Sequence, residues 1–419
     1  MIGGYILSNA FDLKKRNMLQ LLEAIYLNGA VTKPDLARMT HLTLPTVHNF
    51  VAELTASKVV REIGIADSQG GRRASLYEFN TNLYSILGVR MTLGRIELGL
   101  FDLNLNCLHY KRVNIDFNSL TAEEGMQHII DSIAIVLREW DVSKKSLLGI
   151  GLTVPGPVDP NSGTIVKLPN LSHWKSVPAK SRLEREFHVK TILEKDSLSN
   201  VIALKWLGHS NSTDNIIYLV IEMGIGIGLL SNGRLLRGKN CMLGEIGHIS
   251  IDENGPLCNC GNRGCLEWYA SDIGIIQRIT KRLQEEKSPH LLELCNHNPT
   301  ALNMKMILEA AQKGDVIAIS EMEFCLKYIA ICITDIIKLY DPDKIIIGHR
   351  WLKDYPEMYD RTLEYIYMNG FFADHESVDI HLDETDNLEL TASAAIVLQY
   401  QFADTKNCKF IRRPSDSTK

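Results

Sequence analysis

Apolar and polar residues alternate with two different periods along the first eighty residues of the chain. In residues 18–26 the apolar positions recur at i, i+3, i+4 and i+7, which predicts a helix with one buried face. The Asn28-Gly29 pair that follows predicts the end of this helix, because asparagine and glycine tolerate the left-handed conformation in which helices commonly stop.

Two shorter helices are predicted next, and each begins at a threonine. Thr32 and Thr43 are expected to be N-caps, because a threonine hydroxyl accepts a hydrogen bond from a backbone N–H of the first helical turn. A proline two residues after each threonine also fits the first turn. The predicted inward-facing residues are Leu36, Ala37 and Met39 in one helix and Val47, Val51 and Leu54 in the other. A short helix, a tight turn and a second helix predict a helix-turn-helix, whose last helix lies in the major groove of DNA.

After the third helix the pattern changes to that of β-strands. Residues 59–65 and residues 76–79 are predicted strands, and the turn between them ends in two glycines and two arginines. This order predicts a winged helix, in which Arg72 and Arg73 reach the DNA backbone or the minor groove. A three-helix bundle used for dimerisation, with the arginines in a solvated turn, is the alternative.

The polar side of the third helix carries the candidate base contacts. These residues point away from its apolar positions and are Pro45, Thr46, His48 and Asn49. An asparagine amide can pair with adenine through two hydrogen bonds, while threonine and histidine can bond to bases or phosphates. The first eighty residues are therefore predicted to bind DNA.

From residue 81 onward the pattern predicts an α/β protein with two similar halves. Strand patterns are followed by helical patterns once in the first half and again in the second. Such a repeat predicts duplicated α/β lobes with a cleft between them. The predicted domains are residues 1–80, 81–196 and 197–387, and a helix at about 388–402 is expected to pack back onto the first lobe.

Composition and charge narrow the class of protein. A chain of 419 residues is expected to form two or three domains, and 45% hydrophobic with 23% charged residues is typical of a soluble globular protein. The net charge of −5 does not indicate nucleic-acid binding, although residues 1–80 carry nine basic and seven acidic residues. The most apolar run, residues 216–230, is too short to span a bilayer and contains Glu222. Because residues 1–16 do not form a secretory signal, a cytoplasmic protein without membrane contact is predicted.

Three of the nine cysteines lie within eight residues, in the segment CNCGNRGC at positions 258–265, and His248 precedes this segment by ten positions. From the residues alone, the segment is compatible with a disulfide knot, a metal site or a glycine-rich loop. An odd number of cysteines, six of them scattered singly, favours a reducing cytoplasm. In that compartment clustered cysteines indicate a metal more often than a disulfide.

Four motifs, in this order along the chain, carry a resemblance to a known family. They are VPGPVD, MGIGIGLLSNGRLLRG, GEIGHISID and CNCGNRGCLE, and the most specific is EIGH followed by the Cys-x-Cys-x4-Cys cluster. The whole chain resembles the ROK family, which unites sugar repressors, uncharacterised open reading frames and sugar kinases. With a winged helix in front, it is most similar to the xylose-repressor branch. The resemblance implies a two-lobed actin- or hexokinase-like body with a ribonuclease H-like fold.

The resemblance also implies a metal site and a sugar site. The implied ligands of a structural zinc ion form a closed Cys3His set, made of His248, Cys258, Cys260 and Cys265. The residues implied to contact a sugar are Asn170, Asp196, Glu245, His248 and Glu267. A turn residue and a helix cap are the alternatives for Asn170 and Asp196. Lys195 replaces the asparagine of the family's END motif, so acidic or phosphorylated sugars stay open as ligands.

The resemblance to sugar kinases breaks down at three nucleotide contacts. Arg90 stands where the aspartate of an Asp-x-Gly-x-Thr hairpin belongs, Ile225 replaces the hydroxyl residue of a Gly-Thr-Gly loop, and His349 replaces one glycine of a Gly-Gly turn. Phosphoryl transfer depends on charge positioned at the phosphates, so a base at Asp196 would lack a phosphate cradle. The chain is therefore predicted to have a kinase fold without kinase activity.

The predicted function is a sugar-responsive transcriptional repressor of carbohydrate-utilisation genes, such as those of xylose metabolism, in the cytoplasm at the nucleoid. Its expected partners are operator DNA, a monosaccharide or sugar derivative bound between the lobes, and further copies of the chain in a homodimer or a dimer of dimers. Two alternatives stay open, an ATP-dependent sugar kinase with an attached DNA-binding arm and a repressor relieved by a protein partner.

Overall fold

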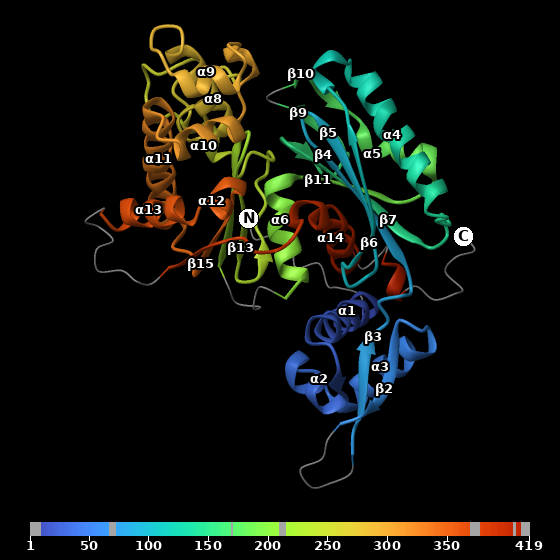
Figure 1. The fold of residues 1–419 in the computed structure, drawn as a ribbon. Coiled ribbons are helices and arrows are strands. Elements are labelled where there is room, and N and C mark those ends of the chain that lie inside the picture. The colour runs from blue at the N-terminus through green and yellow to red at the C-terminus, as the bar shows by residue number, and fades with distance from the viewer. Residues whose placement is uncertain are drawn as a thin grey trace, which may run out of the picture. The chain divides into compact units, whose positions relative to one another are not determined.

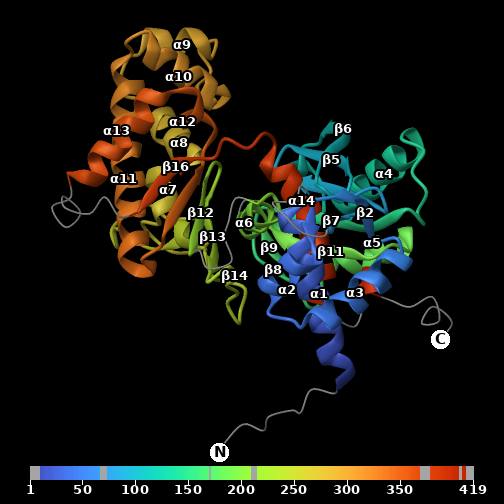
Figure 2. The ribbon, with the colours of Figure 1, turned by 90° about the horizontal axis from the view of Figure 1, so that it is seen from below.

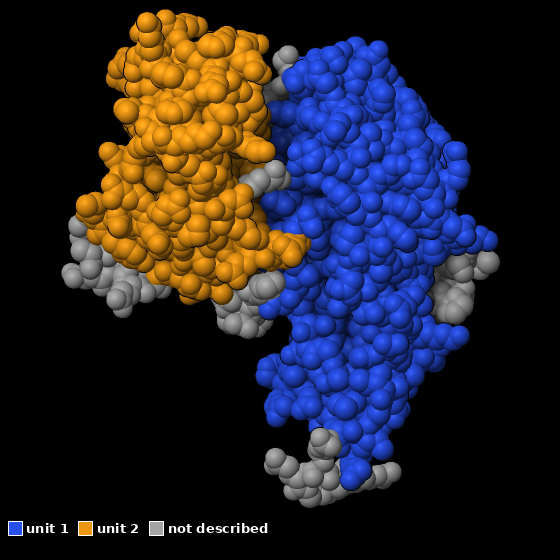
Figure 3. Space-filling model, viewed as in Figure 1, with its two compact units in different colours: residues 1–209, 387–419 blue, residues 210–386 orange. Residues whose placement is uncertain are grey.

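The chain divides into two compact units (Figure 3). Unit 1 comprises residues 1–209 and 387–419, and unit 2 comprises residues 210–386. The computed structural model describes residues 10–66, 73–168, 171–208, 215–368, 378–404 and 408–411. Each unit has its own cluster of buried apolar side chains, so each has its own hydrophobic core.

Unit 1 begins with three helices whose caps agree with the sequence pattern. They are α1 (Ala10–Asn28), α2 (Lys33–Thr40) and α3 (Leu44–Ala56) (Figure 1). The side-chain oxygens of Thr32 and Thr43 each accept a hydrogen bond from a backbone N–H three residues later, which confirms both predicted N-caps. The prediction for Met39 is wrong, because the buried face of the two-turn helix α2 runs through Leu36 and Thr40 and leaves Met39 42% exposed.

A three-stranded antiparallel sheet completes this N-terminal module, in the order β1–β3–β2. Its strands are β1 (Val31–Thr32), β2 (Val60–Ile65) and β3 (Ser75–Phe79). The turn between β2 and β3, which contains Arg72, lies outside the described residues. β1 was not predicted, because two residues are too few to show a period. It pairs Thr32 with Leu76 and so ties the cap of α2 to the strand pair.

The body of unit 1 is built on a five-stranded sheet in the order β6–β5–β4–β7–β11. Its strands are β4 (Ser85–Met91), β5 (Arg95–Phe101), β6 (Cys107–Asn114), β7 (Leu147–Val154) and β11 (Thr191–Lys195). Neighbours among β4, β5 and β6 are antiparallel, whereas β7 and β11 run parallel to β4. A smaller antiparallel sheet contains β8 (Val158–Asp159), β9 (Thr164–Leu168) and β10 (Leu171–Val177).

Unit 2 repeats this plan with a five-stranded sheet in the order β14–β13–β12–β15–β16. Its strands are β12 (Ile216–Ile221), β13 (Ile225–Ser231), β14 (Arg234–Leu235), β15 (Lys344–Gly348) and β16 (Asp379–Leu382). Again neighbours among the first three strands along the chain are antiparallel and the last two strands run parallel to the first. The shared strand order confirms the predicted duplication of an α/β lobe.

Helices cover the larger sheet of unit 1. They are α4 (Ala122–Glu139), α5 (Ala179–Phe187), α6 (Asp196–Trp206) and α14 (Leu388–Ala403). α14, from the end of the chain, contacts β4 and β7 and lies beside α6 (Figure 1). A Cβ atom at Gly151 of β7 would lie 1.7 Å from the Ser393 carbonyl oxygen of α14. Only glycine therefore allows the helix to approach the sheet so closely.

Most of the helices described in unit 2 follow β14 in the sequence and come before β15. The helices of this unit are α7 (Leu266–Ala270), α8 (Asp272–Arg282), α9 (Pro289–Leu294), α10 (Met304–Gln312), α11 (Val316–Tyr340), α12 (Arg350–Asp354) and α13 (Pro356–Tyr367). Short 3-10 turns occur in both units, namely η1 (Phe117–Ser119), η2 (Ile246–His248), η3 (Pro299–Ala301) and η4 (Lys409–Ile411). α8 and α11 lie on one side of the sheet (Figure 2) and share its apolar core. In the described part of the chain, no helix has the length and apolar character needed to cross a membrane.

Candidate functional site

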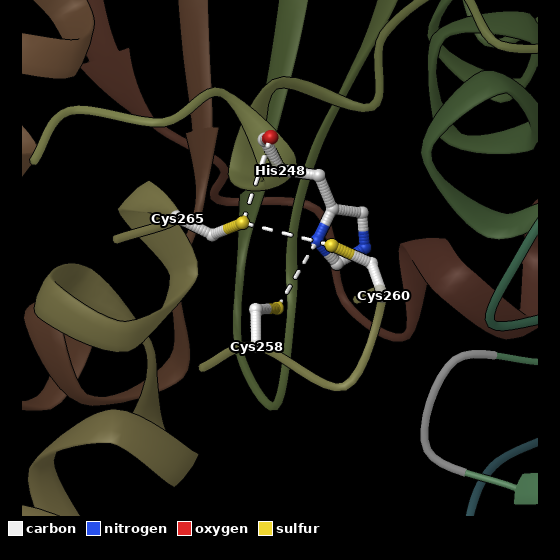
Figure 4. A group of neighbouring side chains, drawn as sticks. All are labelled: His248, Cys258, Cys260 and Cys265. Carbon is white, nitrogen blue, oxygen red and sulfur yellow. Dashed lines mark hydrogen bonds between the residues drawn. The ribbon is translucent and has the colours of Figure 1, made fainter. Parts of the chain in front are cut away.

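Four potential metal ligands from one short stretch of unit 2 converge. His248 ends η2, Cys258 and Cys260 lie in the loop that follows, and Cys265 comes directly before α7. Their ligand atoms all lie within 4.8 Å of one another (Figure 4). The fold thus brings together all four residues that the resemblance implied as ligands.

The distances in this cluster fit a tetrahedral metal ion rather than a disulfide. The Sγ atoms of Cys260 and Cys265 are 3.6 Å apart, and the Cys258 Sγ lies 3.7 Å from the His248 Nδ1. Tetrahedral zinc, with Zn–S of about 2.3 Å and Zn–N of about 2.0 Å, would place two sulfurs about 3.8 Å apart and a sulfur and a nitrogen about 3.6 Å apart. A disulfide needs about 2.0 Å between its sulfurs. The donor set and its spacing therefore fit a structural zinc ion.

Burial affects the protonation of the thiols in this cluster. Burial raises the pKa of the Cys258 thiol and of the Cys265 thiol above the ordinary cysteine value. Since the thiolate is the form that binds a metal, burial alone works against ligation. A divalent cation at the centre of the cluster would reverse this effect by stabilising the thiolates. Zinc binding would therefore have to displace the protons of these thiols.

Glycine and backbone hydrogen bonds give the cysteine loop its tight path. Gly264 has a φ of +59°, and a Cβ atom at this position would lie 1.7 Å from the Asp252 carbonyl oxygen. The Leu266 N–H donates to the Ile249 carbonyl oxygen over 2.9 Å. This bond ties the start of α7 to the residue after η2, so the elements that carry the first and last ligands are held together by the backbone as well.

Two carboxylates implied to bind sugar lie near this cluster in unit 2. Glu245 directly precedes η2, and Glu267 is the second residue of α7. Burial raises the pKa of Glu267 to about 7, and the negative charge of Glu245 also raises it. The Ile225 N–H, which donates a hydrogen bond to the Glu267 carboxylate, acts in the opposite direction and lowers this pKa. A Cβ atom at Gly224 would lie 2.8 Å from the Glu267 Oε2, so glycine leaves the carboxylate its space. Sequence reasoning missed this role of residues 224–225, because a backbone N–H gives no side-chain signal.

The two ring nitrogens of His248 have different neighbours. Nδ1 faces the Cys258 sulfur, and Figure 4 shows the second ring nitrogen directed away from the sulfurs of Cys258 and Cys265. A histidine that binds a metal through one nitrogen commonly forms a hydrogen bond through the other. His248 could therefore bind a metal ion through one nitrogen and a sugar through the other, which are the two roles that the resemblance implies for it.

The other implied sugar contacts belong to unit 1. Asp196 is the first residue of α6, and its carboxylate accepts a hydrogen bond from the Ser197 N–H over 2.6 Å. The residue at the N-cap position is Lys195, and its side chain is buried. The alternative interpretation of Asp196 as the N-cap is therefore wrong by one position. Asn170 lies outside the described residues.

The residues that depart from the kinase motifs are buried and have structural neighbours. Arg90 and Glu97 are opposite each other on β4 and β5, and the Arg90 guanidinium donates to the Glu97 carboxylate over 2.8 Å. Burial would raise the pKa of Glu97, but the charges of Arg90 and Arg95 outweigh it and lower that pKa. His349 follows β15, and burial lowers its pKa to about 3, so its ring is neutral at pH 7. Ile225 is buried at the start of β13.

The predicted DNA contacts of the N-terminal module are on the exposed side of α3. The buried residues of this helix are Val47, Phe50, Val51 and Leu54. Pro45, His48 and Asn49 are exposed, and Thr46 is half-buried. Arg73 is exposed next to β3, and Arg72 lies outside the described residues. The amphipathic pattern of α3 thus separates a packing face from a polar face, as the sequence indicated.

The fold defines a two-unit α/β protein with an N-terminal helical module, and comparisons identify its family. Residues 86–381 match the sequence pattern of the ROK family. The chain is 31% identical over 344 residues to a xylose repressor of Bacillus spizizenii, which covers 82% of this chain and 84% of that protein. It is 29% identical over 351 residues to the DNA-binding transcriptional dual regulator NagC of Escherichia coli strain K12, which covers 83% of each chain. The chain belongs to the ROK family.

A solved structure extends the comparison to the fold. It is a ROK family transcriptional regulator described as a homologue of the E. coli MLC protein, with a TM-score of 0.78 and 24% sequence identity. The match covers 93% of this chain and 97% of that one. At this identity the match concerns the fold, and it confirms that the α/β body is of the ROK type.

Proposed function

We propose that this protein is a DNA-binding transcriptional repressor of carbohydrate-utilisation genes, and that a sugar changes its affinity for DNA. One observation carries this proposal. The match to the solved transcriptional regulator covers 93% of the chain, so it extends beyond residues 86–381 into the N-terminal helices. The xylose repressor and NagC likewise match over more than four fifths of the chain. A sugar kinase would have no need of such an N-terminal module.

The N-terminal module is the proposed DNA-binding domain, a winged helix-turn-helix with α3 as the recognition helix. Its exposed side would contact base edges and phosphates through Pro45, Thr46, His48 and Asn49. Arg72 and Arg73, in the turn after β2, would contact the DNA backbone or the minor groove. A homodimer would place two such modules on the half-sites of a pseudo-palindromic operator.

The proposed effector is a monosaccharide or sugar derivative, and five residues are proposed to contact it. The residues are Asn170 and Asp196 from unit 1 and Glu245, His248 and Glu267 from unit 2. Carboxylates suit this task, because each can accept hydrogen bonds from two hydroxyl groups. Among the relatives, one is named a xylose repressor and another, 29% identical over 351 residues, is named an N-acetylglucosamine repressor, so the similarity supports a sugar effector as a class. The sugar would act by binding one of two conformations more tightly than the other.

A structural zinc ion in the Cys3His cluster would hold the effector residues in place. His248 is both a proposed zinc ligand and a proposed sugar contact, and Glu267 is two residues beyond Cys265. All four ligand positions would be taken by the protein, so the ion would supply loop stability rather than a reactive site. The distances between the donor atoms support this assignment.

We assign no kinase activity to the ROK body of this chain. The Arg90–Glu97 ion pair supports this assignment, because a guanidinium paired with a carboxylate over 2.8 Å is largely neutralised before any phosphate arrives. The buried, neutral His349 likewise offers no positive charge at pH 7. Phosphoryl transfer requires such charge at the phosphates.

Two assays on the purified full-length chain test the proposed function. Selection from a random-sequence DNA duplex library should enrich a two-fold symmetric site, and fluorescence anisotropy should then show that one sugar of a panel changes the affinity for that site. The panel contains D-xylose, N-acetylglucosamine, N-acetylglucosamine 6-phosphate and glucuronate. A coupled ADP-release assay with the same sugars should show no turnover above background. Turnover would favour the kinase alternative, and a library without enrichment would refute DNA recognition.

A further inference from the structure

Lys33 connects the recognition helix with the strand pair of the N-terminal module. It is the first residue of α2, and its Nζ lies 3.3 Å from the His48 Nδ1 on α3. The same ammonium lies 5.0 Å from the centroid of the Tyr77 ring on β3. Tyr77 is itself buried, and its hydroxyl donates to Glu62 on β2 over 3.3 Å. The lysine head group is thus held between an aromatic ring and an imidazole by a cation–π contact and a hydrogen bond.

The chemistry of the two groups decides which atom donates in this hydrogen bond. An ammonium has three N–H donors and no acceptor, so the His48 Nδ1 must accept. An Nδ1 that accepts carries no proton, so the neutral ring bears its only proton on Nε2. The contact therefore selects one tautomer and one orientation of the ring.

We infer that Lys33 is a positioning residue that makes His48 a hydrogen-bond donor, and only a donor, toward DNA. This inference rests on the proposed function, since it assumes that the exposed side of α3 faces base edges. His48 is exposed next to Asn49, so its Nε2–H is the polar group it offers on that side. In the major groove guanine presents two acceptors, N7 and O6, whereas cytosine presents only its amino donor. His48 therefore favours guanine and rejects cytosine at the base that it contacts.

Without the lysine, the same histidine would lose this restriction. A neutral imidazole can carry its proton on either nitrogen, and it can turn so that either nitrogen faces the DNA. It would then accept from cytosine nearly as well as it donates to guanine. An alternative role for Lys33, a plain contact to a phosphate, would weaken binding to every sequence alike and lower the salt dependence. These two roles give different results in the experiments below.

The first experiment observes the tautomer without DNA. The full-length protein is labelled with ¹⁵N-histidine, and the His48 resonances are assigned with a His48→Gln variant. At about pH 8.5, well above the ordinary histidine pKa of about 6.5, the parent should show a protonated Nε2 and an unprotonated, hydrogen-bonded Nδ1. Lys33→Met keeps an unbranched side chain on Tyr77 but has no donor, so it should show a mixture of tautomers. Lys33→Arg should retain the single tautomer, because a guanidinium also has donors only.

The second experiment reads base preference by selection from a random-sequence duplex library. The position whose preference disappears in His48→Ala is the base that His48 contacts. There the parent should prefer guanine to cytosine by about three- to tenfold, the effect of one hydrogen bond. Lys33→Met should reduce this ratio to within about twofold at that position alone, and Lys33→Arg should restore it. Lys58→Met is the matched control, because Lys58 is in the same module and its side chain makes no hydrogen bond or ion pair with any described residue.

The outcomes separate this inference from the proposed function. Enrichment by the parent together with an unchanged guanine preference in Lys33→Met would overturn the role of Lys33 and leave the repressor intact. An equal loss of affinity for all sequences would show that Lys33 contacts a phosphate instead. A parent that enriches no sequence would overturn DNA recognition and the base preference together, whatever tautomer the first experiment finds.

Discussion

The rings of Tyr26 and Trp206 meet edge to face, with centroids 5.2 Å apart and an interplanar angle of 83°. Tyr26 belongs to α1 of the N-terminal module, and Trp206 is the last residue of α6, the helix that begins at Asp196. A salt bridge of 2.8 Å between Glu23 and Lys205 joins the same two helices. One helix of 11 residues thus has a proposed sugar contact at its first residue and the proposed DNA-binding module at its last. Such a rigid element could carry a change at one end to the other.

The Tyr26 hydroxyl should be dispensable for stability. It is buried in this aromatic contact and forms no hydrogen bond with any described residue. Because a buried hydroxyl without a partner is unfavourable, Tyr26→Phe should leave the free energy of unfolding unchanged or raise it by up to about 1 kcal/mol. Tyr218→Phe is the matched control, since its hydroxyl donates to Asp383 over 2.8 Å, and it should lose about 1.5–3 kcal/mol. Urea unfolding measures both, and a loss above about 1 kcal/mol in Tyr26→Phe would mean that its hydroxyl does have a partner.

Elemental analysis should find about one zinc per chain in protein purified without chelators, because four protein ligands complete a tetrahedral site. Cys260→Ser should reduce the zinc content and lower the melting temperature of unit 2. Since the loop also supports Glu267, Cys260→Ser should weaken the response to sugar more than it weakens DNA binding. Cys107→Ser, which changes an exposed cysteine of β6, should leave the zinc content, the melting temperature and the response to sugar unchanged. Native protein free of zinc that still responds to sugar would end the metal assignment.

The wing and the recognition helix should contribute differently to DNA binding. Replacing Arg72 and Arg73 together by Ala should weaken binding to all sequences similarly and flatten the salt dependence, because these residues would contact phosphates. Asn49→Ala should cost about 1–3 kcal/mol at the selected operator alone, because an amide reads a base edge. Anisotropy titrations against operator and scrambled duplexes at several salt concentrations separate the two effects. Normal binding by the double arginine variant at moderate salt would remove the wing from the interface.

Local rules made much of the fold predictable from the sequence. Thr32 and Thr43 could be recognised as caps, because a cap depends only on the residues of one helical turn. Several strands of the two larger sheets could be found as short apolar runs between turn residues, since such a run needs only its own residues. Met39 shows the limit of this reasoning, because its exposure depends on which side of a two-turn helix the rest of the module covers.

Contacts between distant segments could not be read from the sequence. The glycine at position 151 gave no sign that it faces Ser393 across 242 positions of the chain. The Ile225 N–H on Glu267 was missed for a similar reason, because backbone donors are the same in every residue. The Cys3His cluster was implied by the family resemblance, and its residues are close in sequence, with three of them within eight residues and the fourth ten positions before. Residues of a site that are local in sequence were found, and their supporting contacts were not.

Glu267→Ala should separate sugar sensing from DNA binding. The change should leave operator affinity near the parental value without sugar, because Glu267 is in α7 of unit 2 and the proposed DNA contacts are in unit 1. Loss of a charged hydrogen-bond partner should cost about 1.5–3 kcal/mol of sugar binding, about a tenfold fall in affinity or more. Anisotropy titrations of the operator at increasing sugar concentration measure this shift. Glu253→Ala, which removes an exposed carboxylate between η2 and α7, is the control, and a parental response in Glu267→Ala would exclude Glu267 from the site.

His349 should make the stability of the protein depend on pH in the acid range. Burial lowers its pKa to about 3, and neither ring nitrogen has a hydrogen-bond partner among the described residues. In the unfolded chain a histidine has a pKa of about 6.5, so between about pH 3 and pH 6.5 the unfolded state binds the extra proton. The contribution of this residue to stability is therefore complete above about pH 6.5 and falls as the pH is lowered, with a slope of up to about 1.4 kcal/mol per pH unit.

The comparison of parent and His349→Phe isolates this contribution from all other titrating groups. Phenylalanine keeps an aromatic ring next to Trp351, whose ring centroid lies 4.1 Å from that of His349, and it cannot be protonated. The variant should be as stable as the parent or slightly more stable at pH 7, because two buried nitrogens without partners are removed. Urea unfolding at about pH 5, 6 and 7 should show a shallower loss of stability toward acid than in the parent. The exposed His128→Gln variant should follow the parent, and equal slopes for His349→Phe and the parent would show that the His349 ring is protonated in the folded protein as well.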